Sequence, residues 1–358
     1  MVAYIRRLAV ERKHWLDDGT FQAGISLCQT IPGATAMQMA AYVGLKARGV
    51  CGAAASFIGF GLPAFLFMTA LAMLYTRVSS LPAVVAAFTG LHVLIVAIIA
   101  NATLSFGRTA LKRWSNFILA ALAALAFFFG VHPVIVIASS AILGLIMLID
   151  KHERPNVGTQ EIRTGTFRPV IFILLAVIII SSGLFFIDRK LFALGILMMR
   201  IDLFAFGGGF ASIPLMFHEV VQVRSWLPPN VLMDGIALGQ VTPGPIVITA
   251  TFIGYMVQGI SGAMVATVGV FTPSFLMVIG VTPYFDSLRT SSYFVKALNG
   301  ILCSFVGLLL AVTIRFGLNA AWSPVCIMLA VAALTALILK VDILWVVLAG
   351  TIFSIILC

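Results

Sequence analysis

Long runs of apolar residues separated by short polar loops constrain this chain more than any other feature. Of its 358 residues, 61% are hydrophobic and only 9% are charged, whereas charged residues make up about a quarter of a soluble domain. A helix needs about 20 apolar residues to cross a bilayer, and many of the runs reach that length. The runs show no strand-like alternation, and a spanning segment must satisfy its own backbone. The sequence therefore predicts an all-α, polytopic transmembrane bundle.

Twelve candidate membrane segments stand out by composition. They lie at 20–46, 51–75, 82–104, 117–130, 133–149, 169–187, 191–212, 230–256, 260–281, 293–314, 324–339 and 342–357. The net charge of +10 does not indicate nucleic-acid binding, because Lys and Arg occupy short loops between these segments, as the positive-inside bias predicts. The five cysteines lie in apolar segments without CxxC spacing, so we expect no metal site and no disulfide framework. No cofactor is expected.

The sequence repeats itself at an offset of about 211 residues. Gln29 and Pro32–Gly33 correspond to Gln240 and Pro243–Gly244. One residue is then lost in the second copy, and the glycines at 44, 49 and 52 match those at 254, 259 and 262. Chance matches between apolar segments would give identities of Leu and Ala, not of Gln, Pro and Gly. We therefore expect two homologous halves, as in many transporters.

The repeat sets the expected organisation of the chain. Residues 1–149 form a first repeat and residues 191–358 a second. Between them, residues 150–190 hold a polar loop with four Lys or Arg at 150–168 and a connecting helix at 169–187. The basic loop is expected to be cytoplasmic.

The first repeat lacks a counterpart for one segment of the second. The glycine-rich stretch 206–210 precedes Trp226, and its counterpart would fall before Met1. Residues 1–18 correspond instead to 212–229. We therefore expect the native protein to begin about 25–35 residues earlier, with an apolar helix that ends in a Gly-Gly motif, because one span needs about 20 residues plus flanks.

Two stretches carry a resemblance to a known family. They read CQTIPGATAMQMAAYVGLKARGVCGA at 28–53, and FGGGFASIPL followed by GQVTPGPIVITATFIGY between 206 and 255. These stretches resemble the two halves of the long form of chromate ion transporters, and the resemblance covers nearly the whole chain. It implies a multi-pass transporter of the cytoplasmic (inner) membrane, built from inverted repeats, for chromate, a tetrahedral dianion shaped like sulfate.

Each Pro-Gly pair should break its membrane segment. Pro32 removes a backbone donor and clashes with the preceding turn, and Gly33 tolerates unusual backbone angles. The resulting pieces of about 12 residues are too short to cross alone, so the freed backbone groups must line protein or a cavity. A half-helix that begins after the break presents N–H groups and a positive dipole end, which suits an anion. A simple kink is the alternative, but two copies with Gln three residues before Pro favour an oxyanion cradle in each half.

Neutral hydrogen-bond donors around these breaks suit a transporter, because it must release its anion as well as bind it. The stretch FGGGF at 206–210 is a further break, which would either expose N–H groups or allow close helix packing. The predicted substrate-binding residues are Gln29, Thr30, Pro32, Gly33, Thr35, Gln38, Gly207, Gly208, Gly209, Gln240, Thr242, Pro243, Gly244, Thr249 and Thr251.

Four residues are candidates for coupling or gating. Asp202 lies inside an apolar segment, where a charge is costly and suggests function, so it would either carry a coupling proton or face the headgroups. His218 and Glu219 follow the glycine break, but HEVVQ lacks the second His of the zinc-protease motif HExxH. Glu219 is expected to help gate the site or to pair with Arg224. His92 is expected to be a packing residue rather than a proton carrier.

The charge pattern leaves two topologies open. If every segment crosses and the 150–168 loop is cytoplasmic, loop Lys and Arg divide 12 inside to 8 outside, and the halves are inverted. If the Pro-Gly segments re-enter instead, the division becomes 15 to 5 and the halves are parallel. The positive-inside bias favours the second arrangement and the resemblance favours the first. We expect inverted repeats.

Three classes of function fit a chain of this kind to different degrees. The leading one is a secondary transporter of chromate or sulfate, driven by an ion gradient or the membrane potential because no nucleotide-binding motif is present. A passive anion channel would rather use rings of charge or a symmetric oligomer. A membrane enzyme would need converging His, Asp or Glu, and the chain offers only scattered ones. The sequence leaves open the preferred anion, the coupling ion and whether a homodimer forms.

Overall fold

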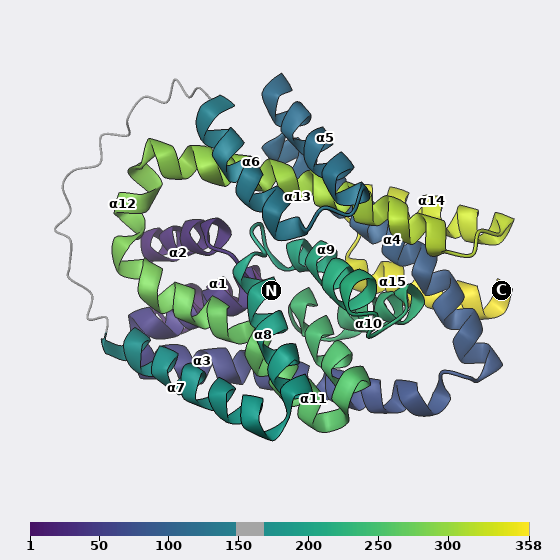
Figure 1. Cartoon of the computed structure of the whole chain (residues 1–358), viewed down its shortest axis with the longest axis horizontal. Helices are drawn as coiled ribbons and strands as arrows, with labels where there is room; N and C mark the ends of the chain where they lie inside the picture. The colour runs from purple at the N-terminus through teal and green to yellow at the C-terminus, as the bar shows by residue number, and fades with distance from the viewer. Residues whose placement is uncertain (148–167, 358) are drawn as a thin grey trace.

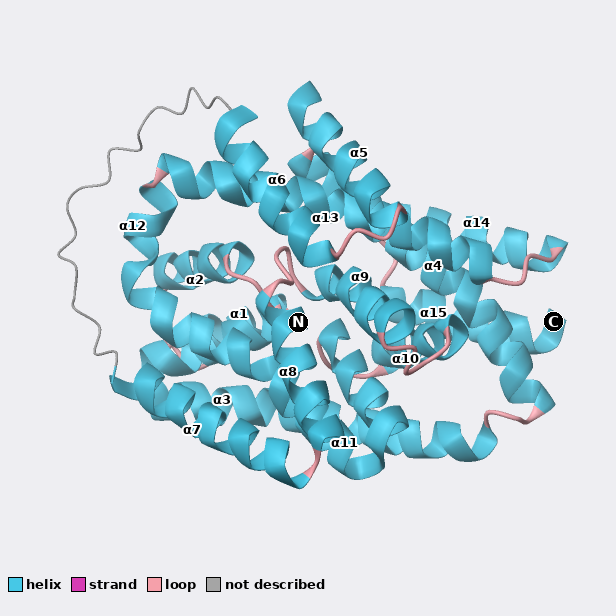
Figure 2. Cartoon of the chain, in the orientation of Figure 1, coloured by secondary structure: helices cyan, strands magenta, loops and turns pink. Residues whose placement is uncertain are grey.

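The structure, a computed structural model, describes residues 1–147 and 168–357. All regular structure in this part of the chain is helical, in agreement with the predicted class (Figures 1 and 2). The polar loop expected at 150–168 lies, apart from Arg168, outside the described residues. Before it come α1 (Val2–Arg6), η1 (Arg7–Arg12), α2 (Asp18–Thr30), α3 (Thr35–Val78), α4 (Pro82–Ala110), α5 (Trp114–Phe128) and α6 (Pro133–Met147).

The second part of the chain adds the connecting helix and a longer set of elements. These are α7 (Arg168–Ile187), α8 (Arg189–Leu203), η2 (Gly209–Ala211), α9 (Ser212–Met216), η3 (Phe217–Val223), α10 (Pro229–Val241), η4 (Ile246–Ile248), α11 (Thr249–Val281), η5 (Thr282–Tyr284), α12 (Phe285–Thr290), α13 (Ser292–Asn319), α14 (Pro324–Ile338) and α15 (Ile343–Leu357). Several begin at ordinary helix-start signals. Asp17 caps α2 by accepting a hydrogen bond from the Thr20 amide (3.0 Å), and proline opens α4, α10 and α14.

Each Pro-Gly pair reverses the chain. Residues on the two sides of Pro32–Gly33 meet across the turn: the Tyr42 hydroxyl donates to the Thr20 carbonyl (3.3 Å), and a Cβ on Gly24 would overlap the Tyr42 ring. In the same way, a Cβ on Gly235 would overlap the Phe252 ring across Pro243–Gly244. The segments predicted at 20–46 and 230–256 therefore break where expected, and their two pieces fold back on each other as antiparallel hairpins.

A second reversal follows in each half, inside α3 and inside α11. Arg48 and Gly49 have backbone angles of −144°, 28° and 65°, −156°, and Gln258 and Gly259 have almost the same values, −148°, 28° and 61°, −146°. Gly49 and Gly259 are both in the left-handed region, which explains why glycine recurs at this place in the repeat. The Ser56 hydroxyl reaches the Ala40 carbonyl (2.8 Å) across the first of these turns. Gly44 packs against Gly52 so closely that a Cβ would clash.

The glycine-rich stretch between α8 and α9 reverses the chain as well. Arg200 in α8 forms an ion pair with Glu219 in η3, and the two residues lie at similar distances from Gly209. The continuous segment predicted at 191–212 is therefore shorter: α8 ends at Leu203, and a hairpin tip follows. This third reversal was not part of either topology considered from the sequence.

The two halves interlock. The later arms of α3 and α11 contact each other in an antiparallel sense, with the rings of Phe57 and Phe275 5.0 Å apart and Gly61 close to Phe271. Helices α5 and α6 pack on α13, whereas α14 and α15 pack on α4. The last two helices of each half thus pack on the long helix of the other half, so that neither half encloses its own core (Figure 1).

Length and composition agree with a membrane-embedded bundle. Within residues 1–147 and 168–357, five stretches are long and apolar enough to cross a bilayer: 35–78, 82–110, 168–187, 246–290 and 292–319. Helices α5, α6, α14 and α15 are apolar but shorter. Helix α7 has no buried residue, and exposes large apolar side chains such as Phe172, Ile179 and Phe186. An apolar helix exposed on this scale is expected to face lipid.

Candidate functional site

The tips of the two Pro-Gly hairpins and the tip of the glycine-rich hairpin meet. The Gly33 amide donates to the carbonyl of Ala205 (2.9 Å), which ties the first Pro-Gly tip to the end of α8. Gly208 lies against Thr35, where a Cβ would stand 3.3 Å from the threonine hydroxyl, and Gly209 packs against Ile246 of the second Pro-Gly tip. Gly33, Gly207 and Gly208 have φ values of 115°, 91° and 98°, so all three positions need glycine.

A cavity of about 660 Å³ lies beside the first tip and the glycine-rich tip. One water molecule occupies about 30 Å³ of liquid, so the cavity can hold a small anion with part of its hydration shell. Its walls come from the end of α2, the start of α3, the glycine-rich tip, the junction of α4 and α5, and α13. The lining residues are Gln29, Thr35, Phe106, Thr109, Ala110, Lys112, Arg113, Asn116, Phe206, Gly207, Ala211, Val295, Asn299, Leu302, Phe305 and Leu309.

The charge of the cavity wall is positive. Lys112 and Arg113 belong to the lining, and none of the lining residues is acidic. Asn116 is buried below them and donates to the Ala110 carbonyl (2.6 Å), which fixes the short turn that carries the two cations. Gln29, Thr35 and Asn299 add neutral polar groups. A dianion in this cavity would meet cations and neutral donors without a repelling carboxylate.

Part of the predicted first cradle lines this cavity. Gln29, Thr35 and Gly207 are in its wall. The Thr30 hydroxyl donates to the Ser26 carbonyl (2.7 Å), and the Gln38 side chain is fully buried and donates to the Pro32 carbonyl. Gln38 therefore stabilises the first Pro-Gly tip and does not line the cavity.

The predicted residues of the second cradle lie outside the cavity. Thr242 donates to the Leu238 carbonyl and Thr249 to the Ile246 carbonyl, both at 2.8 Å, and Thr251 bonds to Thr267 (2.7 Å). Gly244 packs on Ala64, and the Gln240 amide nitrogen has no hydrogen-bond partner within the described residues. An anion-binding role for these residues stays a prediction.

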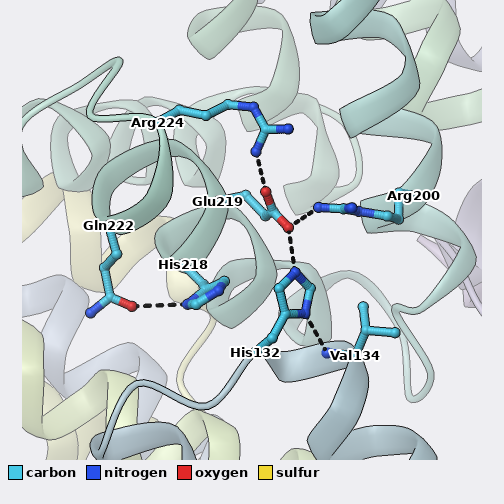
Figure 3. A network of polar contacts seen from close by, with 7 residues as sticks. All are labelled: His132, Val134, Arg200, His218, Glu219, Gln222 and Arg224. Atoms are coloured by element: carbon cyan, nitrogen blue, oxygen red, sulfur yellow. Dashed lines mark hydrogen bonds and ion pairs between the residues drawn. The ribbon is translucent and has the colours of Figure 1, made fainter.

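Glu219 is the centre of a network of polar contacts (Figure 3). Its buried carboxylate pairs with Arg224, as predicted, and also with Arg200 and with the Nε2 atom of His132 (3.0 Å). The Val134 amide donates to Nδ1 of His132 (3.2 Å), so a neutral His132 carries its proton on Nε2 and donates it to Glu219. His218 lies beside His132 and bonds to Gln222 (3.1 Å). The network joins α8 and η3 to the turn between α5 and α6.

Sequence reasoning missed a second buried carboxylate. Asp234 in α10 accepts a hydrogen bond from the Tyr75 hydroxyl (2.7 Å) and contacts His92 Nε2 (2.6 Å). His92 is therefore the partner of an acid, in contrast to the packing residue expected. Lys112, Arg113, Asn116 and Asn299 were missed too. The sequence places the two cations in a loop between apolar segments, and nothing in it connects them to the tips.

Known proteins resemble the chain over nearly its whole length. The sequence model of the chromate transporter family matches residues 1–145 and 192–355. An uncharacterized transporter of Methanocaldococcus jannaschii is 42% identical over 99% of this chain and 88% of its own length. A probable chromate transport protein of Synechococcus elongatus is 28% identical, covering 88% of this chain and 79% of that protein. A chromate transport protein of Cupriavidus metallidurans is 29% identical, covering 86% and 75%. No solved structure matches.

The similar proteins, the apolar helices and the helical architecture all indicate a membrane transporter. The family match falls on the two halves expected from the repeat and leaves out the polar loop and the whole of α7. The chain is a multi-pass membrane protein that belongs to the chromate transporter family.

Proposed function

We propose that this protein is a secondary transporter that carries chromate, or a tetrahedral oxyanion of similar charge such as sulfate, across the cytoplasmic membrane. The observation that carries the proposal is the cation-lined cavity beside the first Pro-Gly tip and the glycine-rich tip. It combines Lys112 and Arg113 with neutral donors and has no acidic lining residue. The two related proteins described as chromate transport proteins support the choice of anion.

In this proposal, the cations and the neutral donors of the cavity wall have different roles. Lys112 and Arg113 attract the dianion and offset the cost of removing part of its hydration shell. Gln29 and Thr35 orient it through neutral hydrogen bonds, each of which contributes about 0.5–1.5 kcal/mol, so that release stays fast. In the proposed cycle, Gln240, Thr242 and the second Pro-Gly tip take over the corresponding contacts when the cavity opens toward the other side.

We further propose that the repeats are inverted. The antiparallel contact between the later arms of α3 and α11 supports this, because these arms correspond to each other in the repeat. Re-entrant Pro-Gly segments imply parallel halves only if 191–212 crosses the membrane. Because a hairpin at Gly207–Gly209 interrupts this segment, re-entrant Pro-Gly segments are compatible with inverted halves. The glycine-rich hairpin returns the chain to the side of the membrane on which α8 begins. The second half therefore enters its first long arm from the opposite side to the first half. Inverted repeats around a central site suit alternating access.

This topology predicts which arginines share a side of the membrane. In a chain with Cys51 and Cys358 replaced by serine, single cysteines at Arg12, Arg48 and Arg289 should react with an impermeant maleimide from the cytoplasmic side. Cysteines at Arg77 and Arg189 should react only from the opposite side. All five positions are exposed, so reactivity reports sidedness rather than burial. Labelling of Arg12 and Arg48 from opposite sides would exclude the re-entrant first hairpin.

Gln29→Ala should weaken chromate binding about 2–12-fold while leaving the protein folded, because one neutral hydrogen bond of about 0.5–1.5 kcal/mol is lost in the cavity. Gln240→Ala is the matched control from the other half, since Gln240 does not line this cavity. With the protein in detergent, in the conformation described here, the control should change affinity less. Binding is measured by equilibrium dialysis with labelled chromate. Equal and unchanged affinities in both variants would contradict a binding role for the first tip.

Flux measurements separate the proposed transporter from a passive channel. In proteoliposomes, labelled chromate uptake should saturate with concentration and should be accelerated by unlabelled chromate inside the vesicles. Such counterflow requires a site exposed to one side at a time. A flux that rises linearly and shows no counterflow would favour a channel. Competition by sulfate, phosphate and molybdate would then rank the oxyanions.

A further inference from the structure

A buried polar cluster lies directly behind the cavity wall. Asp202, Gln38 and Ser274 are fully buried and come from α8, α3 and α11. Asp202 Oδ2 accepts hydrogen bonds from the backbone amide (2.8 Å) and the hydroxyl (2.7 Å) of Ser274. The amide of Ser274 is available because Pro273, which precedes it, disturbs the helical ladder of α11. The cluster is therefore built around one carboxylate.

The same cluster holds the first Pro-Gly tip. The Ala34 amide donates to the Ser274 hydroxyl (3.2 Å), and the Gln38 side-chain amide donates to the Pro32 carbonyl. Gly33 sits between the side chains: a Cβ there would stand 2.8 Å from Gln38 Nε2 and 3.2 Å from Asp202 Oδ1. Asp202 and Gln38 thus converge on the glycine that forms the tip.

Two acceptor atoms in this cluster lack a donor. Asp202 Oδ1 and Gln38 Oε1 are buried and have no hydrogen-bond partner among the described residues. An unpaired carboxylate oxygen and an unpaired amide oxygen are both costly in an apolar interior. One proton on Asp202 Oδ1, donated to Gln38 Oε1, would satisfy both atoms at once.

Within the described part of the chain, Asp202 forms no ion pair. Arg200, two residues earlier, pairs with Glu219. Helix α11 contains no Asp, Glu, Lys, Arg or His, and the first arm of α3 carries none before Lys46, near its far end. The only other titratable groups on these two stretches are the hydroxyls of Tyr42, which bonds to Thr20, and Tyr255. The carboxylate would therefore stand alone if it were ionised.

We propose that Asp202 and Gln38 form a proton-binding site whose occupation favours anion binding in the adjacent cavity. This inference rests on the proposed function and adds the coupling ion to it. Thr35 and Phe206, which line the cavity, lie three and four residues from Gln38 and Asp202. A neutral Asp202 holds the tip against α8 and removes a negative charge from behind the anion site. By reciprocity, anion binding draws a proton onto Asp202, so the two ions move together.

Infrared spectroscopy tests the proton site without any anion. The difference spectrum between acid and alkaline buffer should contain the C=O band of a protonated carboxyl. This band should disappear in Asp202→Asn and shift in Gln38→Leu, which removes its hydrogen-bond partner. It should persist in Asp234→Asn, the matched control at another buried carboxylate. The absence of the band, its loss in Asp234→Asn, or a signal that follows Na⁺ in place of protons would overturn the proposal.

Asp202→Asn is also suited to binding measurements because the amide imitates the protonated acid. Its oxygen can accept both Ser274 bonds, and its NH₂ group can donate to Gln38. We expect wild-type affinity for chromate to rise about 5–150-fold on acidification, a typical range for coupled sites, and the variant to bind tightly at every pH. Unbuffered wild-type protein should take up protons when chromate is added, and Asp202→Asn should not. Chromate binding without proton uptake would refute the coupling alone, whereas no chromate binding at all would refute the transporter assignment.

Discussion

Replacing both Arg200 and Arg224 with methionine should lower the free energy of unfolding by about 3–5 kcal/mol, because it leaves a buried carboxylate without its cationic partners. Glu219 is almost fully buried, whereas the two arginines keep 40% and 28% of their side-chain surface exposed. Only the neutral donor His132 would remain on the carboxylate. Removing the arginines should therefore cost more than removing the acid. Thermal unfolding in detergent, followed by circular dichroism, measures the effect.

A third substitution distinguishes a charge effect from lost packing. Adding Glu219→Leu to the double variant removes the stranded carboxylate and should restore most of the lost stability, since a buried ion pair is often replaceable by apolar groups. Glu11→Ala is the control at an exposed acid. Glu11 contacts Arg6 at 2.8 Å, and this exposed ion pair should contribute less than about 1 kcal/mol to the free energy of unfolding. If the triple variant were as unstable as the double one, the network would stabilise the fold by packing rather than by charge.

The backbone breaks were the most predictable part of the fold. Pro32–Gly33 and Pro243–Gly244 both interrupt helices, because proline lacks a donor and glycine accepts angles that other residues avoid. The repeat also predicted that glycine at 49 and 259 would occupy equivalent places, and both adopt the left-handed conformation. These features depend on a few neighbouring residues, which is why the sequence alone could predict them.

The direction of the chain after each break was harder to predict. A hairpin and a kink have the same local sequence, and they differ in which residues meet across the turn. Tyr42 reaching Thr20, and Arg200 reaching Glu219, are contacts over 22 and 19 residues. The charge count favoured re-entrant Pro-Gly segments, but it treated 191–212 as a crossing segment and therefore tied re-entry to parallel halves. The hairpin at Gly207–Gly209 is the feature that it left out.

The partners of buried charges lay beyond sequence reasoning. Asp234 meets Tyr75 and His92, which precede it by 159 and 142 residues. Their counterparts in the repeat are Ala23, Phe285 and Leu302, so the internal symmetry gave no hint of the contact. Asp202 likewise depends on Ser274, whose counterpart is Ala64. Function in a repeat protein can thus reside in the residues that break the symmetry, and a search for matching pairs overlooks them.

The cavity cations provide the sharpest test of anion binding. Lys112→Gln with Arg113→Gln should raise the dissociation constant for chromate about 10–150-fold, because a hydrogen bond to a charged group contributes about 1.5–3 kcal/mol. The remaining affinity should depend less on ionic strength, since the attraction that salt screens has been removed. Equilibrium dialysis at two salt concentrations measures both effects.

A variant with the same change of net charge must accompany this experiment. Arg77→Gln with Arg189→Gln also removes two positive charges, but neither residue lines the cavity. If it lowered affinity as much as the cavity variant, the effect would come from the overall charge of the protein and the binding site would lie elsewhere. Arg113→Lys separates charge from geometry: a lysine keeps the salt dependence but cannot offer the two-pronged contact that a guanidinium makes with an oxyanion. A partial loss of affinity in that variant, with its salt dependence intact, is the outcome expected if Arg113 contacts the bound anion directly.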